Sequence, residues 1–286
     1  FSITKQSRKR NEIVIVFAND LLTKFSSIWK FVEQNKFYLN QNNLSEKIWQ
    51  LENETNLSLK TKIEKGSITI LQTGIINVYR GVTTGYNPAF IIDNVKRKEL
   101  IREDKANKNI IKPMLQGRNI RKWVYNETSD FIIFTRRGNE IKNYPSIKKH
   151  LAEFKQQLEP GIGRKPGNYN WYEIQDNTAY FSEFEKEKII WGLTSDKWTF
   201  AFDDAGNYLP SNGYILTSKE IPIKYLLAWM NSKLIEFYFG FIGIMTAGGA
   251  YTLKYETVVE FPIKIVDFGV QQSFITLVDF ILLLKK

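Results

Sequence analysis

Hydrophobic and polar positions change their spacing along this chain of 286 residues. Near the start, residues 11–18 form a β-branched apolar run that predicts a strand. Residues 21–32 repeat apolar side chains at steps of three and four, which predicts an amphipathic helix. Residues 37–41 alternate in the manner of a strand, and helices are expected at residues 44–51 and 57–65.

From residue 74 onward, short apolar runs are separated by turns that contain Gly or Asn. We expect strands at residues 75–79, 89–92, 131–135, 188–191, 199–202 and 213–216. We expect helices at residues 146–158, 224–241 and 271–284, and loops at residues 159–170 and 247–251. Strands and helices do not alternate regularly, so the sequence predicts an α+β fold in which mixed strands are flanked by helices and a C-terminal helix follows.

The composition removes several classes of chemistry. The chain has no cysteine, which excludes disulfide scaffolds, zinc fingers and cysteine nucleophiles. Its single histidine, His150, excludes a multi-histidine metal site and argues against a Ser-His-Asp hydrolase. The longest uncharged stretch, residues 237–253, is shorter than the ~20 apolar residues that span a bilayer, and we expect a buried helix that runs into a loop. We therefore expect a soluble cytoplasmic protein, and the initial Phe in place of Met suggests a piece of a longer chain.

Positive charge is concentrated in the first half of the chain. The net charge is +10, but residues 1–150 carry 27 basic and 14 acidic side chains, whereas residues 151–286 carry 13 and 16. Residues 94–122 alone carry ten basic and three acidic side chains. The positive electrostatic potential of such a segment favours binding to a polyanion such as nucleic acid. A solvated lysine-rich surface is the competing interpretation for the charge alone.

Two polar turns contain the most informative side chains. Residues 80–87 (RGVTTGYN) resemble neither a phosphate-binding P-loop nor a GxGxxG loop, and the two glycines equally suit a tight turn between strands. Residues 111–123 contain Arg, Asn and Gln, which are the side chains that pair with guanine and adenine edges or hold phosphates. Further basic loops occur at residues 136–138 and 164–167, and the aromatic residues after the second of these could stack on bases or pack in the core.

Paired carboxylates offer weaker evidence for catalysis. Asp203 and Asp204 precede Ala-Gly-Asn, which is typical of a hairpin turn. A nuclease or transferase site built from these two residues and Glu185 stays open as a hypothesis, although no convincing upstream acid completes it. The residues support recognition better than catalysis.

The order of several motifs resembles a known family. These motifs are FYLNQ at residues 37–41, YRGVTTGYNPAFIID at 79–93, IKPMLQGRNI at 111–120, YPSIKKHL at 144–151, WYEI at 171–174, KIIW at 188–191, NSKL at 231–234 and EFPI at 260–263. Together they resemble the TaqI-like C-terminal specificity domain. This is the target recognition domain of adenine-N6 DNA methyltransferases and of type IIG and related restriction-modification enzymes.

The resemblance implies a division of the chain and a function. Residues 1–35 resemble the tail of a preceding methyltransferase domain or a connector, residues 36–265 the DNA target recognition domain, and residues 266–286 a trailing helix with the capacity to pair with another helix. The implied partners are double-stranded DNA and the parent's methyltransferase domain in cis, with no membrane. The implied DNA-binding residues are Arg80, Thr83, Thr84, Asn87, Gln116, Arg118, Asn119, Arg121, Arg136, Arg137, Arg164 and Lys165.

The family's catalytic motifs are not found in this chain. Asn87-Pro88 is followed by Ala-Phe and does not complete an Asn-Pro-Pro-Tyr motif, and no Gly-rich S-adenosylmethionine loop occurs. The resemblance therefore implies that this piece has no catalytic residue, cofactor or metal of its own. S-adenosylmethionine is expected for the missing catalytic domain, and magnesium is expected if the parent also carries a nuclease. Two competing functions stay open, namely a type I-like specificity subunit that docks a separate methyltransferase and a module that binds structured RNA or a partner protein.

Overall fold

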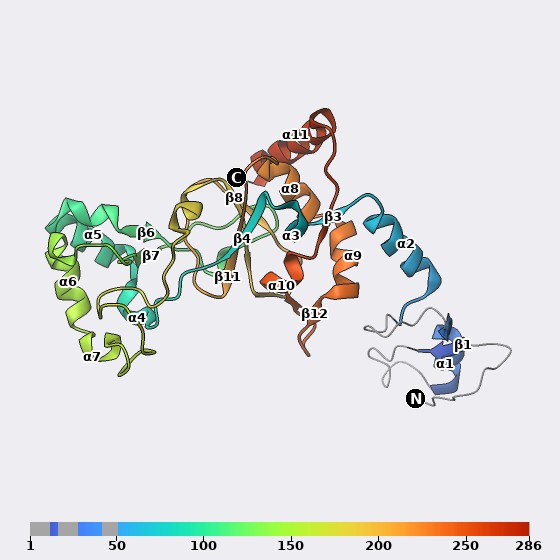
Figure 1. Cartoon of the computed structure of the whole chain (residues 1–286), viewed down its shortest axis with the longest axis horizontal. Coiled ribbons are helices and arrows are strands. Elements are labelled where there is room, and N and C mark those ends of the chain that lie inside the picture. Colours follow the sequence, from blue (N-terminus) through green and yellow to red (C-terminus); the bar gives the residue numbers. More distant parts are fainter. Residues whose placement is uncertain (1–11, 17–27, 42–50, 286) are drawn as a thin grey trace. The chain divides into compact units, whose positions relative to one another are not determined.

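The computed structural model describes residues 12–16, 28–41 and 51–285 (Figure 1). The chain forms two compact units, Phe1–Gly66 and Ser67–Lys286. The fold is mixed α+β with several small antiparallel sheets and a C-terminal helix, as the sequence predicted.

The described part of the first unit contains two antiparallel strands and two helices. Its elements are β1 (Glu12–Ile15), α1 (Ile28–Asn35), β2 (Phe37–Asn40) and α2 (Glu54–Glu64). Asn53 starts α2 ahead of the expected position because its side chain accepts a hydrogen bond from the backbone N–H of Asn56 at 2.8 Å. Most of the helix expected at 44–51, and the first part of the one expected at 21–32, lie outside the described residues.

The centre of the second unit is an antiparallel sheet with the strand order β10–β8–β11–β4. These strands are β4 (Ile76–Arg80), β8 (Lys188–Gly192), β10 (Ala201–Asp203) and β11 (Gly213–Ser218). Successive side chains of β8 point to opposite faces, so Ile190 packs in one hydrophobic core while Ile189 and Trp191 pack in another. Both faces of the central sheet are therefore buried, which explains why β8 is apolar without alternation.

One of the two cores lies among a smaller sheet and a group of short helices. The sheet has the order β5–β7–β6, with β5 (Ile91–Asp93), β6 (Ile111–Pro113) and β7 (Asp130–Ile133). The helices are α4 (Asn87–Phe90), α5 (Asn94–Glu103), α6 (Pro145–Ala152) and α7 (Lys155–Leu158), with 3₁₀ turns η2 (Lys105–Asn109), η3 (Gly117–Asn119), η4 (Ile141–Asn143) and η5 (Phe181–Glu185). Figure 1 shows α5, α6 and α7 gathered at one end of this unit.

The second core lies beneath the C-terminal helices. These are α8 (Ile223–Met230), α9 (Lys233–Ile242), α10 (Tyr255–Val258) and α11 (Phe268–Lys285), together with α3 (Ile70–Thr73). Two small sheets complete this part, β12–β13–β9 and β14–β3, from β3 (Ile68–Thr69), β9 (Thr194–Ser195), β12 (Ile244–Met245), β13 (Tyr251–Thr252) and β14 (Pro262–Ile263). Trp198 lies at the centre, where its ring packs edge-on against Phe200, Phe239 and Tyr251 and its indole N–H donates to the carbonyl of Met230 at 2.7 Å.

Local hydrogen bonds divide the long helix expected at residues 224–241 into α8 and α9. The Asn231 side chain pairs with both backbone groups of Phe200, donating at 2.8 Å and accepting at 3.2 Å. Ser232 then caps α9 by accepting from the backbone N–H of Ile235 at 3.2 Å. The helix expected at 146–158 is also divided, into α6 and α7, although no side chain caps the start of α7.

Two further expectations are corrected. The strand expected at residues 89–92 begins as helix α4, because Pro88 in the first turn favours a helical start, and the strand β5 follows from Ile91. The basic segment that follows is helix α5, which was not predicted from the sequence. Asp93 caps it by accepting from the backbone N–H of Lys96 at 2.8 Å. The other expected strands of this unit are present within a few residues of their predicted bounds.

The last helix, α11, carries an apolar and largely exposed surface. It packs along α8 through the buried Val278, an edge-on contact between Phe274 and Tyr225, and an ion pair of 2.5 Å between Asp279 and Lys224. By length and composition, it is the one helix of the described residues that could cross a membrane.

A fully buried ion pair joins two strands of the central sheet. Lys188 Nζ on β8 lies 2.6 Å from Asp203 Oδ2 on β10, and both side chains are completely buried. Burial lowers the pKa of Lys188, while Asp203 opposes that effect. Asp203 also accepts hydrogen bonds from the backbone N–H of Ala205 and from the backbone and side-chain N–H groups of Asn207. Both carboxylate oxygens are therefore occupied inside the protein.

Removing the buried cation should destabilise the fold. We expect Lys188→Met to lower the free energy of unfolding by about 3–5 kcal/mol, because Asp203 would stay buried without its cation. The double variant Lys188→Met/Asp203→Asn should recover part of that loss, since it buries no unpaired charge. Urea unfolding followed by circular dichroism measures both. A single variant as stable as the parent chain would contradict the assigned role of the pair.

Candidate nucleic-acid interface

The first polar turn follows β4 and is held close to a second backbone segment. A Cβ atom at Gly81 would lie 2.1 Å from the carbonyl oxygen of Pro210, so only glycine fits there. The N–H of Val82 donates to the carbonyl of Leu209 at 2.7 Å, and Arg80 Nε donates to the carbonyl of Ser211 at 2.6 Å. The glycine at this position thus serves a tight structural turn, while the Arg80 side chain stays on the surface.

Arg164 is buried and holds several loops together. Its Nε donates to the carbonyl of Leu158 at 2.7 Å. One terminal nitrogen donates to the carbonyls of Thr84 and Glu173 at 3.0 and 2.7 Å, and the other donates to the carbonyl of Trp171 at 2.9 Å. Burial lowers the pKa of this guanidinium. The expectation that Arg164 is a DNA-facing residue on an exposed loop tip is wrong, because its donors are spent on backbone carbonyls inside the protein.

Thr84 and Arg137 belong to the same buried arrangement. The Thr84 side chain is 2% exposed and donates to Asn87 Oδ1 at 2.6 Å, so the expectation that Thr84 faces DNA is also wrong. Arg137 is half-buried, and its guanidinium donates to the carbonyls of Ile174 and Gln175. The N–H of Gln175 in turn donates to the carbonyl of Thr84 at 3.2 Å. Residues 83–84, 137, 164 and 173–176 therefore form one hydrogen-bonded group.

The second polar turn presents two exposed arginines on a fixed backbone. Its start is closed by a hydrogen bond of 2.9 Å from the backbone N–H of Gln116 to Asn119 Oδ1. Arg118 extends into solvent and pairs with Asp130 at 3.2 Å, an exposed contact of the kind that contributes little stability. Arg121 donates to the carbonyls of Arg118 and Ile120 at 2.6 and 2.9 Å. The side chains of Arg118 and Arg121 are thus exposed, whereas Gln116 and Asn119 are half-buried.

Trp123 anchors the second turn to the central sheet. Its backbone N–H donates to the carbonyl of Phe200 at 2.9 Å, and its carbonyl accepts from the N–H of Phe202 at 3.0 Å. These bonds hold Trp123 at a φ of 83°, the one positive value for a residue other than glycine among those that the structure describes. The neighbouring Lys122 is half-buried, and burial lowers its pKa.

The predicted site residues thus occupy two groups with different surroundings. Thr83, Thr84, Arg137 and Arg164 meet around residues 173–176, and Gln116, Arg118, Asn119 and Arg121 form the second turn. The exposed members of the predicted set are Arg80, Asn87, Arg118, Arg121 and Lys165. Whether these side chains contact DNA stays a prediction.

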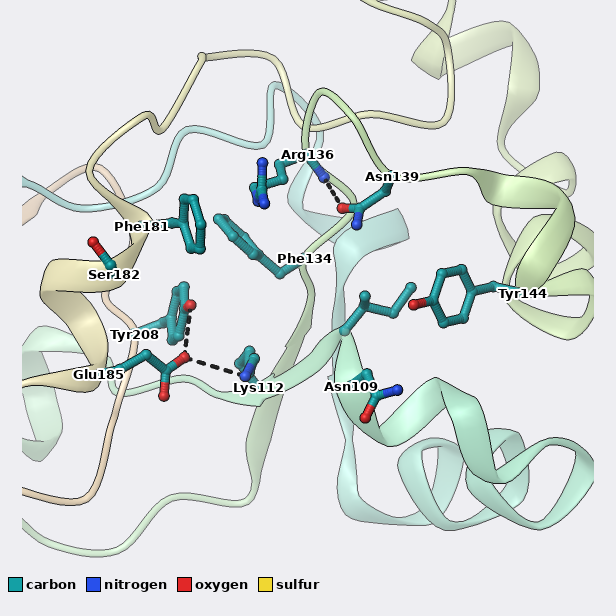
Figure 2. Close-up of a pocket in the computed structure, with 11 residues that line it drawn as sticks. Asn109, Lys112, Phe134, Arg136, Asn139, Tyr144, Phe181, Ser182, Glu185 and Tyr208 are labelled. Carbon is teal, nitrogen blue, oxygen red and sulfur yellow. Dashed lines mark hydrogen bonds and ion pairs between the residues drawn. The ribbon is translucent and has the colours of Figure 1, made fainter.

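A pocket of about 400 Å³ was not predicted from the sequence (Figure 2). Its floor consists of the buried rings of Phe134 and Tyr208, and Phe181 forms a side wall with the Arg136 guanidinium 3.8 Å from its ring centre. Glu185 Oε1 accepts from the Tyr208 hydroxyl at 3.0 Å and pairs with Lys112 Nζ at 3.1 Å. Of the residues that line it, only Arg136 belonged to the predicted set. The rings lie far apart in the sequence, where they are indistinguishable from core aromatics.

The carboxylates considered for a nuclease or transferase site are not brought together as an open site. Asp203 is enclosed by the partners described above, whereas Glu185 faces the pocket and Asp204 is exposed. Within the described ranges, no group of three or more His, Asp or Glu side chains is arranged to hold a metal ion.

Comparison with known proteins gives the class of this chain, the specificity domains of restriction-modification enzymes. Residues 112–263, more than half of the chain, match the TaqI-like C-terminal specificity domain. The chain belongs to this family. The matched region includes the second polar turn and most of the pocket, while the first turn precedes it. No curated protein sequence matches the chain.

Two solved structures have a similar fold. The type IIG restriction endonuclease BpuSI has a TM-score of 0.51 and 13% identity, and the match covers 79% of this chain and 28% of BpuSI. The type IIL restriction-modification enzyme MmeI, solved in complex with DNA, has a TM-score of 0.50 and 11% identity, and the match covers 71% of this chain and 27% of MmeI. The chain thus spans just over a quarter of the length of either enzyme.

The structural role of Arg164 can be separated from that of its exposed neighbour. We expect Arg164→Ala to lower the free energy of unfolding by at least about 3 kcal/mol, because each buried carbonyl left without a donor costs about 1–3 kcal/mol. Lys165→Ala removes an adjacent exposed cation and should change stability by less than about 0.5 kcal/mol. Thermal unfolding of both variants checks this. Equal stability of the two variants would show that the buried guanidinium is dispensable.

Proposed function

We propose that this chain is the sequence-specific duplex-DNA recognition module of an adenine-specific DNA methyltransferase or restriction-modification enzyme. The observation that carries the proposal is the match to the TaqI-like specificity domain, whose matched residues include the turn with Arg118 and Arg121. The excess of basic side chains in the first half supports it, because neutralising phosphates releases counterions from DNA.

The second polar turn suits recognition because its backbone is fixed while its arginines are exposed. Base readout requires donors held at a defined place, and a bidentate arginine discriminates guanine from the other bases. The Gln116–Asn119 hydrogen bond and the Trp123 contacts with the central sheet supply that fixed frame. Arg118 needs only to exchange its solvent-exposed pair with Asp130 for a phosphate or a base.

The remaining steps belong to parts of the parent protein beyond these residues. In this proposal a methyltransferase domain in cis binds S-adenosylmethionine and takes the target adenine out of the base stack, while this module holds the surrounding sequence. If the parent also cleaves DNA, that activity and its magnesium belong to a separate domain. The module itself performs no catalysis and binds no cofactor.

The direct test is selection from a pool of randomised duplex DNA at two salt concentrations. We expect enrichment of a short sequence motif and an affinity that falls steeply as salt rises. Salt-sensitive binding without enrichment would show that sequence reading needs the catalytic domain. Failure to bind at low salt would overturn the proposal and favour a protein-docking role.

Arginines of the second turn should contribute individually to binding. We expect Arg118→Ala and Arg121→Ala each to lower the slope of log affinity against log salt by about one if they hold phosphates. If either contacts a base, its loss should cost about 1–3 kcal/mol at one base pair. Fluorescence anisotropy with the selected duplex measures both quantities.

Lys219→Ala provides the control for these variants. Lys219 is an exposed cation that follows β11. It lies at one end of the β4–β11 strand pair, whereas Arg80 lies at the other end. Its removal should leave the salt slope unchanged. If both arginine variants bind with the affinity and salt slope of the wild type, the second turn does not contact DNA.

A further inference from the structure

The pocket between β6 and η5 has a rigid aromatic floor and an accessible rim. Tyr208 stacks on Phe184 with ring centres 4.6 Å apart and an angle of 10° between the planes, and Phe134 lies against it at 4.9 Å. By contrast, Asn109, Ser182 and Glu185 at the rim are exposed. A volume of about 400 Å³ is within the range of small-molecule sites. Phe134 and Tyr208 are only 4% and 1% exposed, so the half-buried ring of Phe181 is the aromatic surface that a planar ligand can reach.

The polar groups of the pocket include an acceptor that the protein does not use. The Tyr208 hydroxyl and Lys112 both reach the same Glu185 oxygen, Oε1, which fixes the carboxylate. Among the residues that the structure describes, none donates a hydrogen bond to Oε2. A carboxylate oxygen without a donor can accept a hydrogen bond from the exocyclic amino group of a base such as cytosine, and thymine has no such group.

Two cationic side chains also line the pocket. The Arg136 guanidinium is stacked on Phe181, and Lys112 reaches Glu185 from β6 (Figure 2). With one carboxylate and two cations, the pocket carries a net positive charge, which favours a ligand that combines a ring with a phosphate. Tyr180, which precedes Phe181 in the chain, donates its hydroxyl to the carbonyl of Arg80 in the first polar turn at 2.8 Å.

We propose that this pocket binds one unstacked nucleobase that carries an exocyclic amino group, with its ring against Phe181 and its amino group on Glu185. The inference rests on the proposed function and extends it, because the pocket would hold a nucleotide displaced from the duplex within the recognition module itself. Arg136 and Lys112 are then positioned for the adjoining phosphate.

The first experiment measures binding of deoxynucleoside monophosphates, independently of any duplex. Isothermal titration of the chain with dCMP and with dTMP should give about tenfold tighter binding of dCMP, the effect of one hydrogen bond to a charged group. Glu185→Gln should abolish that preference, since the carboxamide of Gln also presents a donor. Glu187→Gln changes an exposed acid two residues away and should leave the preference unchanged.

The second experiment compares a fully paired duplex with the same duplex carrying a one-nucleotide bulge of deoxycytidine. We expect the bulged duplex to bind about tenfold more tightly, because base stacking on an aromatic platform contributes on that scale. Ser182→Trp fills the pocket from its rim and should reduce binding of the bulged duplex to the level of the paired one. Ser273→Trp places the same ring on another exposed serine, on α11, and should have no effect.

The outcomes separate this inference from the proposed function. Binding of paired duplex together with equal affinity for the bulge, and no dCMP preference, would overturn the pocket and leave DNA recognition standing. Binding of dCMP with the expected preference but no binding of any duplex would retain the nucleobase site and overturn the proposed function. If the chain neither prefers dCMP nor binds any duplex, the nucleobase site and the proposed function are both overturned.

Discussion

Burial of the central sheet on both faces is the constraint on which the rest of the second unit depends. Residues 188–191 of β8 are buried, so every polar group there must find a partner within the protein. Lys188 meets this demand through Asp203 and the carbonyl of Phe184, and the Trp191 indole donates to the carbonyl of Leu253 at 3.0 Å. Charged side chains that could contact another molecule therefore lie outside these buried strands, in turns and loops and on exposed helix faces such as those of α5 and α6.

The same constraint divides the arginines into two kinds. A guanidinium has five N–H donors in a planar fork, which makes it effective at joining loop carbonyls as well as phosphates. Arg164 and Arg137 use these donors inside the protein, where they connect Thr84 of the first polar turn to residues 173–175. Arg118 and Arg121 are exposed, and Arg121 donates one nitrogen to the neighbouring carbonyls of Arg118 and Ile120. Residue type alone does not distinguish the two kinds, because the difference lies in which carbonyls the fold brings within reach.

Sequence patterns predicted the fold class and most strands because these depend on local periodicity. The strands β4, β8 and β11 are apolar runs between turn residues, and their existence follows from that pattern. Helix breaks were missed because they depend on distant partners. Asn231 ends α8 by bonding to the backbone of Phe200, which lies 31 residues away. The same reason explains which site residues were misjudged. The exposure of Arg118 follows from the local structure of its turn, whereas the burial of Arg164 depends on carbonyls of other segments, including that of the distant Thr84.

The pocket shows the limit of sequence reasoning most clearly, and also why a recognition module would place such a site there. Its rings come from the residue after β7, from η5 and from the segment before β11, and Phe134 and Tyr208 are 74 residues apart in the sequence. Phe134 and Tyr208 belong to the core, Phe184 stacks on Tyr208 from behind, and the half-buried Phe181 packs against this core. A flexible surface aromatic would lose side-chain entropy on stacking with a base, whereas a core ring has already lost it during folding. The packing that stabilises the fold therefore also preorganises the concave aromatic surface of the candidate interface.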